Sequence, residues 1–114
     1  MSVYIEDGAK AIAHVVTSSY AMITAEVPVH NDTENAVKFS LYNAVINPDG
    51  ACETTTETLY SLQAGEHCVV TDELLRVRDP IEGCRGYSIT SSVCVMGKVL
   101  DQKKFLIEVE MKYR

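Results

Sequence analysis

The chain carries three histidines, the side chain that most often serves as a metal ligand or a general base near neutral pH. They are His14, His30 and His67. No two of them are two or four residues apart, so no single strand or helix would present two on one face. We therefore expect solvent-facing strand residues at these positions, with neither a metal ligand set nor a catalytic triad.

Carboxylates are the second group that could do chemistry, because two of them facing one another can act as acid and base. Glu53, Glu57, Asp72 and Glu73 lie in segments with strand-like alternation and could pair across strands. On a threonine-rich edge strand, however, carboxylates keep the surface soluble and resist edge-to-edge pairing. We expect this second role for all four.

The short motifs of common enzymes are missing from the sequence. It has no Gly-x-Ser-x-Gly elbow, no P-loop and no dinucleotide fingerprint. Asn47-Pro48-Asp49-Gly50 could suggest calcium, but neighbouring residues do not supply the six to eight oxygens required, and the turn interpretation is favoured. Asn31-Asp32-Thr33 fits the glycosylation sequon, which would matter only in a eukaryotic secretory context. The sequence thus predicts no catalytic residue, no cofactor and no metal.

The four cysteines, Cys52, Cys68, Cys84 and Cys94, are spaced 16, 16 and 10 residues apart. This spacing does not match zinc sites built from Cys-x-x-Cys pairs. We expect structural buried thiols, since free cysteine is among the most buried residue types. A disulfide, for example Cys52 to Cys68, is the alternative.

The elements that would position these side chains are strands, because two-residue periodicity dominates and no stretch sustains a helical period. The sequence predicts an all-β, immunoglobulin-like or fibronectin-like β-sandwich of about seven antiparallel strands, with residues 1–114 as a single domain. Six strands are expected at residues 12–17, 21–30, 36–46, 52–59, 67–77 and 87–95, and Phe105, Ile107, Val109, Met111 and Tyr113 mark the last. Pro28 cannot donate to a ladder, so its nitrogen must face an edge or a bulge.

Composition limits the kinds of partner. Of the 114 residues, 46% are hydrophobic and 23% charged, which is typical of a folded soluble domain. The net charge of -6, with only ten Lys and Arg, disfavours nucleic acid and anionic membranes as partners. The first residues lack a signal peptide, so we expect a cytoplasmic protein or one whose export signal lies outside this chain.

Several segments, in this order, resemble the central immunoglobulin-like domain of glycoside hydrolase family 2, which includes β-galactosidases, β-glucuronidases and β-mannosidases. The matching pieces are Val27-Pro28-Val29-His30-Asn31, Ala36-Val37, Pro48-Asp49-Gly50, Leu62-Gln63-Ala64-Gly65-Glu66, Leu75-Arg76-Val77-Arg78-Asp79-Pro80, Tyr87-Ser88-Ile89 and Gly97 to Asp101. The chain departs from the family in lacking Leu-Trp after Pro80 and in closing with Met111-Lys112-Tyr113-Arg114.

The resemblance implies a non-catalytic domain within a parent that hydrolyses β-glycosidic bonds, β-galactosidase-like, with two carboxylates on a (β/α)₈ barrel outside this chain. Its partners would be the adjacent jelly roll and barrel of the parent, and carbohydrate would be met only through the parent. Residues 79–86 and 49–58 are the expected contact segments, and burial against the barrel would leave apolar residues exposed in this chain. A stand-alone interaction or adhesion module is the alternative, and a small autonomous enzyme is the third. The residues alone do not decide whether the chain is part of an enzyme.

Overall fold

The computed structural model describes residues 2–110, which form an all-β fold. The strands are β1 (Val3–Ile5), β2 (Lys10–Val16), β3 (Tyr20–Asn31), β4 (Val37–Ile46), β5 (Cys52–Leu62), β6 (His67–Arg78), β7 (Ser88–Val95) and β8 (Lys98–Val109), with one 3₁₀ turn, η1 (Ile81–Cys84). The seven expected strands are confirmed, and the three-residue β1 is an eighth that was too short to predict. No helix among these residues has the length and apolarity needed to cross a bilayer.

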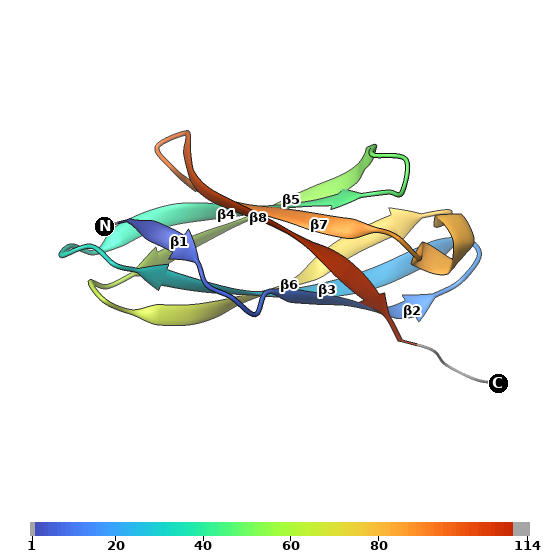
Figure 1. The fold of residues 1–114 in the computed structure, drawn as a ribbon, viewed down its shortest axis with the longest axis horizontal. Coiled ribbons are helices and arrows are strands. Elements are labelled where there is room, and N and C mark those ends of the chain that lie inside the picture. The colour runs from blue at the N-terminus through green and yellow to red at the C-terminus, as the bar shows by residue number, and fades with distance from the viewer. Residues whose placement is uncertain (1, 111–114) are drawn as a thin grey trace.

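The strands form two layers packed face to face (Figure 1). One layer contains β1, β2, β3 and β6, and the other contains β5, β4, β7 and the first part of β8. β8 links the two layers, because it pairs antiparallel with β7 and then parallel with β2 over Ile107 to Val109. The expected immunoglobulin-like sandwich is confirmed, with one parallel strand pair among the antiparallel ones.

The last strand is longer than expected at its beginning. It starts at Lys98, directly after a two-residue turn in which both Met96 and Gly97 have positive φ, 52° and 79°. Two such residues in succession match the twist of the flanking strands, which is why short hairpins use this turn. Met111 and Tyr113, expected as part of this strand, lie outside the described residues.

The strand predicted at residues 21–30 is confirmed as part of β3, and it shows the two-residue alternation. Ile23, Ala25, Val27 and Val29 are all fully buried, while the residues between them are only partly covered. Pro28 lies where β3 passes from β2 to β1, since β2 pairs with residues 21–26 and β1 with residues 29–31. The Pro28 carbonyl accepts a hydrogen bond from the Glu6 amide, just after β1. Because Pro28 lies between the two pairings, its missing N–H removes no hydrogen bond from the β2–β3 or β1–β3 ladder.

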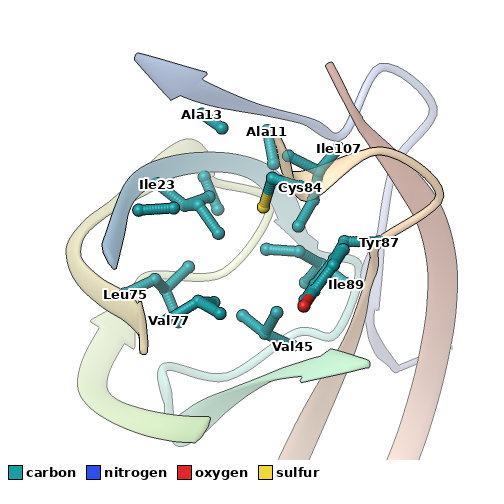
Figure 2. Packing of buried hydrophobic residues seen from close by; sticks show 12 residues of the cluster. Ala11, Ala13, Ile23, Val45, Leu75, Val77, Cys84, Tyr87, Ile89 and Ile107 are labelled. Carbon is teal, nitrogen blue, oxygen red and sulfur yellow. The ribbon is translucent and has the colours of Figure 1, made fainter. Parts of the chain in front are cut away.

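The core consists of two apolar clusters, one toward each end of the sandwich. The first gathers around Ile23, Leu75, Tyr87 and Ile89, with Cys84 pointing its sulfur into it from η1 (Figure 2). The second includes Val27, Leu41, Val70 and Val93. Each cluster contains side chains from both layers, so each helps to hold the two layers of the sandwich together.

The turn predicted at Asn47-Pro48-Asp49-Gly50 is confirmed. The Asn47 side-chain oxygen accepts hydrogen bonds from the amides of Asp49 and Ala51, at 2.9 and 3.0 Å. Gly50 has a φ of 91°, which side-chain-bearing residues rarely adopt. With its oxygen used in this way, Asn47 acts as a turn former.

Candidate functional site

A buried polar layer separates the two apolar clusters, and it contains the first candidate for chemistry, Asp72. Its side chain accepts hydrogen bonds from Asn43 Nδ2, at 2.9 Å, and from the Thr56 hydroxyl. Asn43 Oδ1 in turn accepts from Ser91 Oγ, and the Leu74 amide donates to Asp72 Oδ1 at 3.0 Å. The interpretation of Asp72 as a surface carboxylate is therefore wrong, because it is only 3% exposed.

The reason is a bulge in β6. Ile23 of β3 pairs with Leu75 and Ala25 pairs with Asp72, so β6 has one residue more than β3 between these pairs. Before the extra residue, the even-numbered residues Val70 and Asp72 face the interior, and after it the odd-numbered residues Leu75 and Val77 do. Asp72 is thus the last even-numbered residue of β6 that faces inward. It is surrounded by hydrogen-bond donors and is closed to substrate.

Other carboxylates line a shallow groove of about 640 Å³ beside β1. Asp101 Oδ2 accepts a hydrogen bond from the Ile5 amide at 2.8 Å, and Asp7 pairs with Lys103 at 3.0 Å. Glu6 pairs with His67. These three carboxylates have structural partners, and their arrangement is not that of an acid and a base facing across a bond to be cleaved.

The histidines are not all isolated, which corrects the sequence-based interpretation. His30 and His67 stack with ring centroids 3.8 Å apart and an angle of 6° between the rings. Tyr4 Oη lies 2.9 Å from His30 Nδ1, and Glu6 Oε2 lies 3.0 Å from His67 Nδ1. His14 is separate, with Nε2 3.0 Å from Thr24 Oγ1. The structure thus brings two of the three histidines together with a carboxylate, a group we call the histidine cluster: Glu6, His30 and His67.

Sheet register produces the histidine cluster. His30 is opposite Tyr4 in β1 and opposite His67 in β6. The backbone of the next residue, Asn31, hydrogen-bonds to residues 65 and 66, so His30 and His67 form a non-hydrogen-bonded pair, the kind in which side chains lie closest. Because 36 residues and two strands separate the histidines along the chain, sequence spacing could not reveal the pair.

Asn31 fixes this register through its side chain. Its Nδ2 donates to the carbonyls of Asn35, Leu62 and Gln63 at 2.8 to 3.2 Å, and its Oδ1 accepts from Thr33. The residue is fully buried. A glycan on this nitrogen is incompatible with the folded chain, so the sequon does not mark a modification site of the folded protein.

The cysteines differ widely in environment. All four are free, but only Cys84 is buried, whereas Cys52 is exposed. The expectation of buried thiols thus fails for Cys52, which begins the edge strand β5. Burial raises the pKa of the Cys84 thiol to about 11, with a smaller contribution from the Glu53 carboxylate. Cys52 is ten residues from the end of β5 that leads to Cys68, roughly 30 Å along an extended strand, which excludes a bridge between them.

An apolar groove of about 230 Å³ lies between β4, β5 and the β7–β8 turn. Phe39 and Tyr60 line it, and Leu59 and Met96 stand at its rim with 77% and 99% of their surfaces exposed. We call these four residues the apolar groove. The structure has exposed apolar residues, as the sequence led us to expect. Leu59 and Met96 lie outside the two segments predicted to make contacts, whereas the exposed Ile81 lies within residues 79–86.

Comparisons with known proteins find this fold in large enzymes. The chain is similar to a solved β-glucuronidase from glycoside hydrolase family 2, with a TM-score of 0.84 and 17% identity over 94% of this chain and 12% of that one. It is also similar to Bacteroides uniformis β-glucuronidase, with a TM-score of 0.81 and 22% identity over 90% of this chain and 14% of that one. For a β-galactosidase from Bacteroides fragilis, described as putative, the TM-score is 0.66 with 21% identity, over 95% of this chain and 16% of that one.

The sequence itself matches no family model and no curated protein. At sequence identities of 17% to 22%, the structural similarity establishes the fold. The expected similarity to family 2 glycoside hydrolases is therefore confirmed for the fold. The chain spans 12% to 16% of the length of the three solved chains, so it corresponds to a domain-sized part of each.

Proposed function

We propose that this chain is the non-catalytic sandwich domain of a larger glycosidase of family 2 type, one whose catalytic barrel hydrolyses β-glycosidic bonds. The observation that carries the proposal is the match of at least nine-tenths of the chain to small segments of much longer glycosidases. In this account residues 1–114 form one domain, which joins a sugar-binding jelly roll to the barrel. The parent is β-galactosidase-like in its reaction.

The chemistry of the described residues supports a structural role. A retaining glycosidase needs two carboxyl groups about 5 to 5.5 Å apart at an open site. Here the buried carboxylate Asp72 is enclosed by Asn43 and Thr56, and the groove carboxylates are paired or bonded to backbone. Sugar hydrolysis would then depend on residues outside this chain.

The apolar groove is where we place contact with a neighbouring domain of the same chain. Leu59, in strand β5, and Met96, in the β7–β8 turn, line the same groove, and burying side chains of this size stabilises a contact by about 1.5 to 3 kcal/mol each. The occupant is a neighbouring domain because the solved chains of this fold are several times longer than this one. Residues 79–86 and 49–58 remain predicted contact segments.

Hydrolysis of a panel of nitrophenyl β-glycosides, including the galactoside, glucuronide and mannoside, tests the proposal. The panel is applied to the 114-residue chain and to the full-length parent at equal molar concentration. Activity in the parent alone is the expected result, and the preferred glycoside would name the sugar. Activity in the 114-residue chain would overturn the proposal, and activity in neither would favour a stand-alone interaction or adhesion module.

A further inference from the structure

The histidine cluster gathers metal-binding atoms from three segments on the outer face of one layer. One ligand atom each from Glu6, His30 and His67 lies within 4.8 Å of the other two. We propose that the histidine cluster is a binding site for a divalent transition-metal ion of the zinc type. This inference does not depend on the proposed function.

The donor set suits zinc. Two imidazole nitrogens and one carboxylate oxygen are a set of three protein ligands that zinc accepts, with water in a fourth position. Imidazole favours zinc, copper and nickel over magnesium or calcium, which prefer oxygen ligands alone. The net charge of -6 also favours cations near the surface.

The distances suit a small ion once the rings of His30 and His67 rotate out of their stack, because parallel rings 3.8 Å apart cannot both direct an in-plane lone pair at one ion. Ligand atoms at 2.0 to 2.2 Å from a tetrahedral zinc are roughly 3.4 Å from one another. Glu6 Oε2 and His67 Nδ1 are 3.0 Å apart, and the widest separation in the histidine cluster is within 4.8 Å. The backbone is set by the pairing of β1, β3 and β6, so side-chain rotation alone must close the remaining gap.

Tyr4 is the positioning residue of this site. Its hydroxyl lies 2.9 Å from His30 Nδ1, and its ring meets the imidazole edge-on with centroids 5.3 Å apart. A partner on one ring nitrogen fixes the orientation of a metal-binding histidine, and loss of such a partner typically weakens metal affinity 10- to 100-fold. Access is open, because 59% of the His67 side chain and 30% of the Glu6 side chain are exposed.

Titration with Co²⁺ and Zn²⁺ in a non-chelating buffer tests the proposal. The 114-residue chain is used without a polyhistidine tag and with Cys52→Ser as the common background, because the exposed thiol is itself a metal ligand. Visible absorption of bound Co²⁺ reports the ligand geometry, and calorimetry with Zn²⁺ gives stoichiometry and affinity. His30→Ala and His67→Ala remove ligands, Tyr4→Phe removes the positioning hydroxyl, and His14→Ala is the matched control from β2.

We expect one ion per chain, at least tenfold weaker binding in His30→Ala and in His67→Ala, and unchanged binding in His14→Ala. Tyr4→Phe should weaken binding roughly tenfold while keeping the Co²⁺ spectrum, a combination that loss of a ligand would not give. Urea unfolding of each variant shows that it is folded under the titration conditions. Absence of binding at millimolar metal, or binding that survives both His30→Ala and His67→Ala, would overturn the proposal.

Discussion

Individual buried polar residues hold the geometry of this sandwich. Asn31 ties the β3–β4 turn to the β5–β6 turn, and Asp72 ties the two layers together through Asn43 and Thr56. Every fully buried side-chain nitrogen or oxygen in residues 2–110 has a hydrogen-bond partner. Because an unpaired buried polar group is costly, single changes at such positions should have large effects.

Asn31→Asp should lower the free energy of unfolding by at least about 3 kcal/mol. The change replaces a donor to three carbonyls with a buried carboxylate that faces the same oxygens without a proton to offer. Asn35→Asp adds the same charge at an exposed position in the same turn and should cost less than about 0.5 kcal/mol. Urea denaturation of both variants measures the difference, and equal effects would contradict the role given to Asn31.

Cys84 should make the chain less stable at alkaline pH. Its pKa is about 11 in the folded chain against an ordinary 9.0, so the folded state holds the proton more tightly. The stabilisation is fully present below pH 9 and is lost as the pH rises toward 11, by up to about 1.4 kcal/mol per pH unit for this group.

The test is urea unfolding of the wild type, Cys84→Ala and Cys52→Ala across pH 8 to 10.5. Cys84→Ala should show a shallower loss of stability above pH 9, whereas Cys52→Ala, at an exposed site, should follow the wild type. Other titrating groups contribute equally to all three proteins. Parallel curves for Cys84→Ala and the wild type would show that this thiol is not held protonated by the fold.

At the scale of elements, the connection between β6 and β7 is pinned by Tyr87. Its fully buried side chain accepts a hydrogen bond from the Ile81 amide at 2.9 Å, next to a turn in which Asp79, Glu82 and Cys84 all have positive φ. A tyrosine hydroxyl bonded to backbone just upstream is a known feature of immunoglobulin-like sandwiches. This contact holds η1 against the first apolar cluster.

Tyr87→Phe should lower the free energy of unfolding by about 1 to 2 kcal/mol and speed hydrogen exchange at the Ile81 amide, because that amide loses its acceptor. Tyr20→Phe, at a half-exposed position, should change stability by less than about 0.5 kcal/mol. Urea denaturation and amide exchange by NMR provide the two readouts. Unchanged exchange at Ile81 would mean that the turn is held by other contacts.

Strand positions could be predicted from the sequence because alternation and turn residues are local signals. β3 and the turn at Asn47 to Gly50 follow directly from such signals. Asp72 could not be placed, because the bulge that turns it inward depends on how β6 pairs with β3. The histidine cluster was missed for the same reason, since register between strands far apart in the chain is not encoded in spacing.

On the scale of the whole molecule, the chain is an elongated sandwich of 50 × 26 × 19 Å. β1 and the end of β8 lie toward opposite ends of the long axis (Figure 1). This arrangement suits a spacer between other domains. The apolar groove, on the layer that contains β4 and β5, is the surface at which we propose contact with a neighbouring domain.

Leu59→Ser combined with Met96→Ser should leave the isolated chain within about 1 kcal/mol of wild-type stability, because both side chains are exposed there. In the full-length parent the same double change should lower the melting temperature of the unit containing this domain, since the proposed contact with a neighbouring domain would be lost. Val69→Ser, an exposed apolar site on β6, is the control. Calorimetry measures the change in melting temperature in the isolated chain and in the full-length parent. Equal changes in the two proteins would contradict docking at the apolar groove.

The central claim, that this sandwich serves a larger glycosidase, is tested most directly by sequencing the complete open reading frame that encodes it. We predict a jelly-roll domain encoded before these residues and a (β/α)₈ barrel after them, with two carboxylates at the carboxyl ends of barrel strands. An open reading frame that encodes neither domain would contradict the claim and leave a stand-alone interaction module as the better account.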